Sequence, residues 1–129
     1  MILETQAAYN KVGIDVSAAG PAVDLQMDFR NADIISIDCV LTALTGGTAP
    51  TVQFILERLS ADGVTWVQLS APAAISAPNT TPSTGIVTFD VGPGLALVKL
   101  VGRAHRIRHI TTGAPATAVA TINAFTNNL

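Results

Sequence analysis

The chain has 129 residues, of which 12% are charged and 49% are hydrophobic, and its formal net charge is −2. This length fits one domain that buries a core without a disulfide or a metal, and the negative net charge argues against nucleic acid or an anionic membrane as a partner. A typical soluble domain carries about twice this share of charged residues. We therefore expect much of the surface to lie against other protein molecules, the alternative being a monomer covered with Thr, Ser and Ala.

The charges are unevenly distributed along the chain. Eight of the nine acidic residues lie in 1–62, whereas four of the seven basic residues lie in 63–129, where Asp90 is the one acid. The two halves either face each other inside one fold or make the molecule complementary to a copy of itself.

The first segment, 1–12, suits a short N-terminal arm. Residues 3–11 contain no Gly or Pro but are too few for a helix that is stable alone, so we expect the arm to be extended or to form one or two helical turns. The start lacks the basic and apolar stretches of a secretory signal, and no segment approaches the roughly 18 apolar residues of a membrane span. These features favour synthesis in a cytoplasm.

From residue 23 onward, apolar residues alternate with polar ones in short runs separated by Gly, Pro and Asp. This is the period of half-buried strands, and it predicts an all-β fold over 1–129, a single-domain antiparallel β-sandwich or jelly-roll-like barrel. The stretch 70–85, rich in Ala, Pro, Ser and Thr, predicts a long loop that is functional, mobile or ordered by a partner. The expected strands are 23–29, 35–41, 52–59, 65–69, 86–91, 95–101, 106–112 and 118–125.

Two turn motifs stand out between these strands. Residues 45–52 and 112–119 align without a gap, and both predict wide hairpins with Gly in the turn and Pro at the strand entry; the match is either a structural repeat or a product of the Ala and Thr bias. In the hairpin 60–66, Asp62 is expected to cap backbone N–H groups and Trp66 to anchor the core. This hairpin resembles, one residue short, the structural Asp-box of sialidase propellers.

No group of residues indicates catalysis or a metal site. His105 and His109 lie on one predicted strand about 13 Å apart, too far to share an ion, and the same spacing separates Asp24 from Asp28, too far for paired glycosidase chemistry. Nucleophile motifs and phosphate-binding glycine loops are absent from the sequence. Cys39 lies in an apolar stretch that predicts a buried thiol. We expect no enzyme activity, cofactor or metal.

The basic stretch 103–109 is the candidate contact surface. Arg106 and Arg108 share one face of the expected strand, opposite Ile107, so they lie either on a solvated outer face or in a salt-bridged contact with an acidic partner. Apolar residues of the arm would bury in a neighbouring subunit. The candidate assembly residues are Ile2, Leu3, Tyr9, Arg103, Arg106 and Arg108.

Three motifs in a fixed order carry a family resemblance: the turn 46–51, the hairpin 60–66, and Arg106-Ile107-Arg108 followed by the turn 112–115. Together they resemble small β-sandwich structural proteins in the virions of tailed bacteriophages, over about 41–125. The sequence departs from that pattern in three places. Ala61 stands where those proteins have Pro, Ile107 stands where they have Tyr, and the second turn, 112–115, differs from the first.

The resemblance implies a virion protein made in the host cytoplasm, such as a capsid decoration (cement) protein that bridges neighbouring subunits, with other copies of itself and a major virion protein as partners. A tail, collar or fibre-associated domain is the alternative within the same family. A carbohydrate-binding module uses a similar sandwich, but sugar binding requires exposed aromatic rings, and aromatic residues make up 5% of the chain. Only Tyr9 and Trp66 are candidates for such rings.

Overall fold

The computed structural model describes residues 4–25, 34–79, 85–91 and 105–128. These residues form eight β-strands, and no helix that could cross a membrane occurs among them. The strands are β1 (Glu4–Asp15), β2 (Val23–Leu25), β3 (Ile34–Thr45), β4 (Thr51–Leu59), β5 (Trp66–Ser70), β6 (Ile86–Val91), β7 (His105–Thr112) and β8 (Thr117–Asn128).

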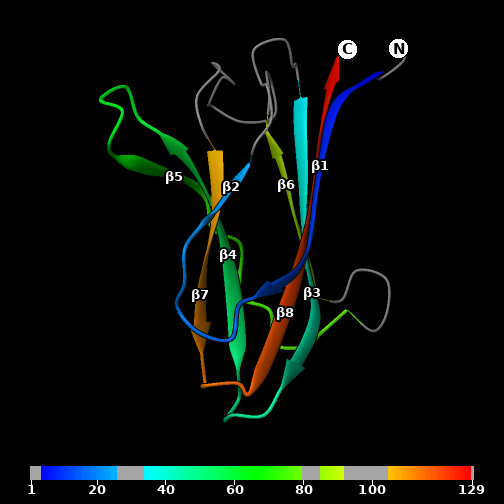
Figure 1. Ribbon diagram of the computed structural model, residues 1–129, viewed down its shortest axis with the longest axis vertical. Helices are drawn as coiled ribbons and strands as arrows, with labels where there is room; N and C mark the ends of the chain where they lie inside the picture. Colours follow the sequence, from blue (N-terminus) through cyan, green and yellow to red (C-terminus); the bar gives the residue numbers. More distant parts are fainter. Residues whose placement is uncertain (1–3, 26–33, 80–84, 92–104, 129) are drawn as a thin grey trace.

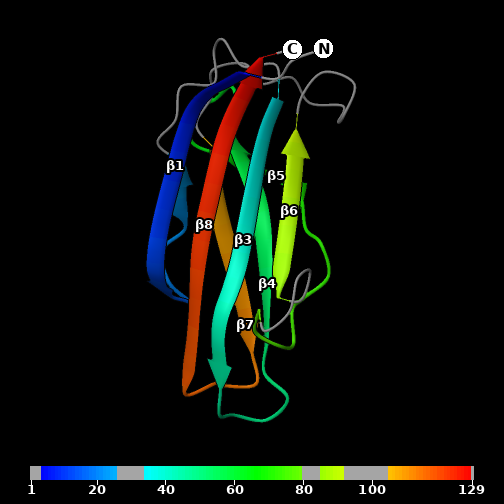
Figure 2. The ribbon, with the colours of Figure 1, turned by 90° about the vertical axis from the view of Figure 1, so that its right-hand side faces the viewer.

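The strands form two four-stranded antiparallel sheets in the orders β1-β8-β3-β6 and β2-β7-β4-β5, which pack face to face (Figures 1 and 2). Pairing joins the first strand to the eighth, the second to the seventh, the third to the sixth and the fourth to the fifth. That is the order of a long antiparallel ribbon wound into two layers, the jelly roll. The predicted all-β sandwich is confirmed.

The core lies between the two sheets and follows the predicted alternation. Along β3, Ile35, Ile37, Cys39 and Leu41 are fully buried, whereas the residues between them are partly exposed. Burial raises the pKa of the Cys39 thiol, so this group is the buried, unreactive thiol that the sequence predicts. The other large, fully enclosed side chains include Val52, Phe54, Leu56, Ile107 and Ile122.

The turns 46–50 and 113–116 are connections between the sheets, so the prediction of two hairpins is wrong. Each leads from a strand of one sheet to a strand of the other, and the two lie side by side. The Thr48 amide donates to the Gly113 carbonyl at 2.9 Å, and the Ala116 amide donates to the Thr45 carbonyl at 2.8 Å. The alternation of apolar and polar residues within a strand does not determine which strand pairs with it. The same sequence pattern is therefore compatible with a hairpin and with a connection between sheets.

Residues 4–15 are an edge strand rather than a free arm. Of the two conformations expected, the extended one is observed, but the backbone of β1 pairs with β8 along most of its length. Tyr9 and Ile14 pack against the core of the same chain. The sequence of this segment alone does not show that the core is its apolar partner. Ile2 and Leu3 lie outside the described residues.

The stretch 70–85 is tied to both sheets in its described part. Ile75 exchanges two backbone hydrogen bonds with Val52 of β4, and the Asn79 amide donates to the Leu41 carbonyl of β3 at 2.7 Å. The segment thus crosses from one sheet to the other at the β5–β6 side. Of the other expected strands, 26–29 and 95–101 lie outside the described residues.

We predict that Gly47→Ala destabilises the fold much more than Gly63→Ala. Both glycines have positive φ, 70° and 74°, but a Cβ at Gly47 would lie 2.2 Å from the Gly113 carbonyl oxygen, whereas a Cβ at Gly63 meets nothing within 4 Å. Gly63→Ala should cost about 1 kcal/mol of backbone strain, and Gly47→Ala at least about 2 kcal/mol more. Urea unfolding of both variants measures the difference, and equal losses would show that the two turns do not meet.

Candidate functional site: the outer face of the β2-β7-β4-β5 sheet

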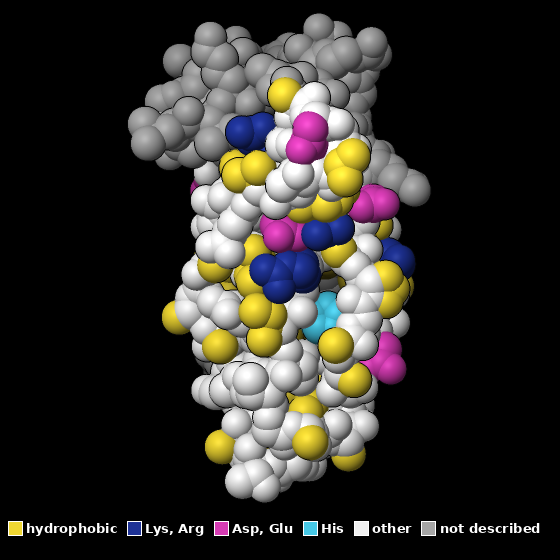
Figure 3. All heavy atoms as spheres, turned by 90° about the vertical axis from the view of Figure 1, so that its left-hand side faces the viewer, with side chains coloured by type: hydrophobic (Ala, Val, Ile, Leu, Met, Phe, Trp, Pro, Cys, Tyr) yellow, Lys and Arg dark blue, Asp and Glu magenta, His cyan; other side chains and the backbone are white. Residues whose placement is uncertain are grey.

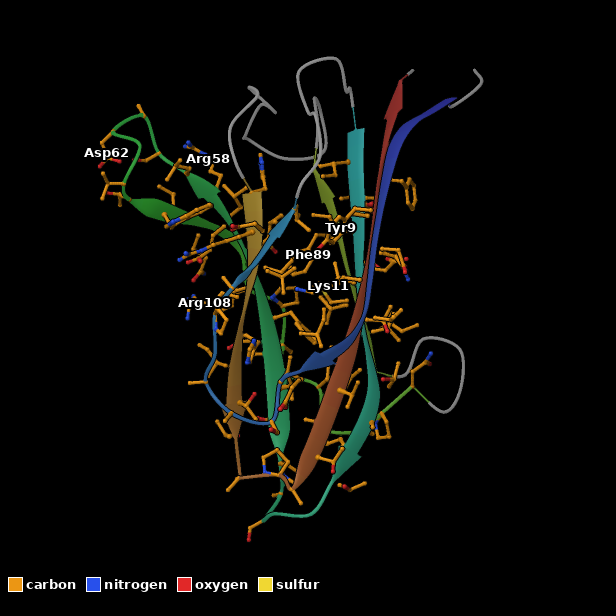
Figure 4. The ribbon with its side chains drawn as sticks, viewed as in Figure 1. Tyr9, Lys11, Arg58, Asp62, Phe89 and Arg108 are labelled. Atoms are coloured by element: carbon orange, nitrogen blue, oxygen red, sulfur yellow. The ribbon has the colours of Figure 1, made fainter. Side chains whose placement is uncertain are left out.

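The alternation along β7 decides which side chains reach the outer face of this sheet. His105, Ile107 and His109 are buried toward the core, and Arg106 and Arg108 lie between them on the opposite face, as the sequence predicts. Figure 4 shows Arg108 on the side of β7 that faces away from the other sheet.

Glu57 of β4 binds both arginines. Arg106 Nε lies 2.8 Å from Glu57 Oε1, and Arg108 Nε lies 3.3 Å from Glu57 Oε2. Glu57 is 6% exposed, although it points to the outer face of the sheet. Taking a carboxylate out of water is costly unless it is paired and hydrogen-bonded, and here each oxygen has its own guanidinium.

The sequence analysis missed Glu57. Forty-nine residues separate it from Arg106, and only the pairing of β4 with β7, in which Glu57 and Arg106 are partners, brings the two together. The signal in the sequence is the charged pair Glu57-Arg58 within the largely apolar run 52–59. The acidic partner expected for the arginines is therefore, in the first instance, part of the same chain.

A row of polar residues crosses all four strands at this level. Arg106 on β7 is the cross-strand partner of Asp24 on β2 and of Glu57 on β4. On its other side, Glu57 is the partner of Gln68 on β5. Cross-strand partners share one face of a sheet. In Figure 3, which looks onto this face, acidic and basic side chains run from the upper third to below mid-height, and the lower end has neither.

Trp66 belongs to this outer face, so the prediction that it anchors the core is wrong. It is partly exposed, and the Arg106 guanidinium lies over its ring, 4.2 Å from the centroid, in a cation–π contact. The core at the middle of β4 is already filled by Phe54 and Leu56. The strand β5 continues the outer row, and its Trp ring packs on the arginine.

The outward ends of both arginines remain available. Each uses its Nε toward Glu57, and within the described part of the chain neither Nη group of Arg106 or Arg108 makes a hydrogen bond or ion pair. The guanidinium side chains are 24% and 36% exposed. Guanidinium Nη groups favour carboxylate and phosphate oxygens as acceptors.

Both histidines are buried, and His109 has a structural contact. The ring Nε2 of His109 lies 2.8 Å from the Ala18 carbonyl oxygen, and the Thr111 hydroxyl donates to the Val16 carbonyl at 2.6 Å. Together these contacts hold the β1–β2 connection against β7. Among the described residues no three His, Cys, Asp or Glu side chains are grouped in a way that could hold a metal ion.

Asp62 orders the β4–β5 turn as expected. Its carboxylate accepts hydrogen bonds from the Val64 and Thr65 amides, both at 2.8 Å, and from the Ser60 and Thr65 hydroxyls, both at 2.6 Å. These donors stabilise the charged form and hold the pKa of Asp62 well below its ordinary value. Figure 4 shows Asp62 at the tip of this hairpin, away from the body of the sandwich.

Of the remaining candidate residues, Tyr9 lies on β1 at the edge of the other sheet and is partly buried against the core. Burial, and to a lesser degree the negative charge of Asp24, raises the pKa of Tyr9. Arg103 lies outside the described residues, as do Ile2 and Leu3.

No family model and no curated protein matches the chain. Among solved structures, the chain is similar to the CBM22-1 xylan-binding domain of Xyn10C from Paenibacillus barcinonensis, with a TM-score of 0.46 and 15% identity over 98% of this chain and 85% of that one. The jelly-roll assignment rests on the strand pairing described above.

We predict that Glu57→Gln lowers the free energy of unfolding by about 1–3 kcal/mol, because two guanidinium groups lose their shared carboxylate but remain free to bind water. Asp24→Asn, which removes an exposed acid from the same row, should change it by less than about 0.5 kcal/mol. Urea unfolding at neutral pH measures both. Equal effects of the two variants would contradict a specific role for Glu57.

The low pKa of Asp62 predicts a pH dependence. A carboxylate whose folded pKa is depressed contributes stability above its unfolded pKa of about 3.9, and that stability is lost as the pH falls toward the folded pKa. Between about pH 5 and about pH 2 the wild type should therefore lose more stability than Asp62→Asn, whose amide does not titrate. Thermal unfolding across this range measures both, and parallel curves would contradict the prediction.

Proposed function

We propose that this chain is a virion structural protein, in the first place a capsid decoration protein, that contacts neighbouring protein through the outer face of the β2-β7-β4-β5 sheet. The observation that carries the proposal is the pair Arg106 and Arg108, which Glu57 holds through their Nε groups while both side chains stay partly exposed. Groups held in place before binding lose little conformational entropy when a partner arrives.

The surface around this pair supports contact with protein. It is poor in charge, and the two inter-sheet turns and their flanking strands, 41–56 and 109–123, contain no Asp, Glu, Lys or Arg. Protein interfaces are depleted in Lys and Glu and enriched in Arg and aromatic residues, and this face carries Arg106, Arg108 and Trp66. The resemblance to phage virion proteins, which rests on the order of the turn, hairpin and basic-strand motifs, supports the same proposal.

The state of Trp66 argues against a carbohydrate-binding role for this face. A sugar packs its apolar side on an open aromatic ring, but Arg106 occupies one face of Trp66. The other aromatic rings with described side chains are Tyr9, Phe54, Phe89 and Phe125, of which Phe54 and Phe89 are buried. The jelly roll is used by both capsid and lectin domains, so the site rather than the fold decides between them.

The test is quantitative mass spectrometry of virions purified from the phage or prophage that encodes the chain, with heads separated from tails. We expect the chain in the head fraction, in a copy number that is a fixed multiple of the capsid subunit. Presence in tails alone would favour a tail, collar or fibre position, and absence from virions would contradict the proposal. A panel of insoluble polysaccharides tested in parallel should show no binding, and binding abolished by Trp66→Ala would favour a carbohydrate-binding module instead.

A further inference from the structure

The outer face of the opposite sheet, β1-β8-β3-β6, carries a pair of acids. Asp38 on β3 and Asp90 on β6 both point away from the core, next to buried Ile37 and Phe89. The two strands pair so that Asp38 lies opposite Thr88 and Asp90 lies opposite Ser36, and each hydroxyl donates to the carboxylate across from it, at 2.8 Å and 2.6 Å. Figure 2 shows β3 and β6 side by side on this face.

No basic side chain balances these acids among the described residues of the face. Lys11 on β1 is the partner of Ile122, a core residue, so Lys11 is directed to the edge of the sandwich rather than to the outer face. Each acid has one carboxylate oxygen bonded to a neighbouring hydroxyl, and within the described part of the chain the other oxygen has no partner.

The acid pair on one face and the arginine pair on the other have matching spacing. Arg106 and Arg108 are two residues apart on one strand, which places them about 7 Å apart. Asp38 and Asp90 are diagonal neighbours on adjacent strands, which places them about 7–8 Å apart. A guanidinium binds a carboxylate best by donating two parallel N–H groups to it. The Nη groups of Arg106 and Arg108, which Glu57 does not use, can donate to a carboxylate in this way.

We infer that two copies of this chain associate front to back, with Arg106 and Arg108 of one copy against Asp38 and Asp90 of the next. The inference rests on the proposed function, because it names a partner for the same face. Such a contact joins two different surfaces and leaves one of each unused at the ends, so it continues into open chains unless the rotation closes a ring.

The size of the face predicts a weak contact. The strands β2, β7, β4 and β5 have 3, 8, 9 and 5 residues, and at about 4.8 Å between strands and about 3.3 Å per residue they give a face of roughly 400 Å² on each copy. About 800 Å² in total lies below the roughly 1,000 Å² of a specific stable interface. Association should therefore appear only at high protein concentration or when a virion surface holds the copies close together, and it should weaken as salt rises.

The test is a charge exchange measured by sedimentation velocity at low salt. One variant carries Arg108→Asp and the other Asp90→Arg, so that each alone meets like charge at the proposed contact, whereas a mixture can alternate with opposite charges throughout. Lys11→Asp is the matched control for Arg108→Asp, because it makes the same change in net charge at the edge of the sandwich. Thermal unfolding of every variant establishes that it is folded.

For the wild type and Lys11→Asp we expect a weight-average sedimentation coefficient that keeps rising with concentration. Each exchange variant alone should associate at least about tenfold more weakly, and their equimolar mixture should recover to within about threefold of the wild type. A wild type that stays monomeric at millimolar concentration, or a mixture that fails to recover, overturns the inference. If Arg108→Asp does not fold, Arg108→Gln and Asp90→Asn are used as the two variants instead. Association of both variants as strong as that of the wild type would then overturn the inference.

The virion mass spectrometry tests the proposed function separately, since a decoration protein that binds only capsid subunits would be found in heads and yet not self-associate.

Discussion

A carboxylate withdrawn from water on the outer face of a sheet has to be matched by fixed cations, and Glu57 is matched by two. Because Arg106 and Arg108 are two residues apart on β7 and Glu57 lies on the neighbouring strand, one carboxylate reaches both Nε groups. This interaction ties the two central strands of the sheet together. It uses the Nε groups and leaves the Nη groups, and in the same row Arg106 lies over Trp66 of β5. The position of the polar row on β2, β7, β4 and β5 follows from it.

The outer faces of the two sheets carry different charged side chains for a reason visible in the strand order. The ribbon that winds into a jelly roll places β7 and β4 in one sheet and β3 and β6 in the other, so the basic strand and the strands bearing Asp38 and Asp90 end up back to back. Asp38 and Asp90 thus lie on one outer face, and Arg106 and Arg108 lie on the other together with Asp24 and Glu57. At the same time, the paired turns at one end, joined by backbone hydrogen bonds, hold the two sheets in a fixed relation.

The sequence was sufficient to predict the strands whose alternation is regular, such as the buried series from Ile35 to Leu41, the outward position of Arg106 and Arg108, and the cap made by Asp62. These depend on residues within one strand or one turn, where the period of the backbone decides the outcome. It was insufficient for β1, whose apolar residues are few, and for the two inter-sheet turns, because a Gly–Pro turn has the same local chemistry whether it closes a hairpin or crosses to another sheet. Glu57 and the exposed position of Trp66 depend on which strands become neighbours, and single-strand patterns carry no information on that.

Arg106 and Arg108 are held from within by Glu57, and we propose that their Nη groups bind a partner. NMR of the arginine side chains as the protein is concentrated, or on addition of its virion partner, tests this directly. The account predicts that the Nε–H signals of both arginines exchange slowly with water in the free protein and remain unchanged, whereas their Nη–H signals become protected when the contact forms. Fast exchange of the Nε–H groups in the free protein, or association with no change at the Nη groups, would contradict it.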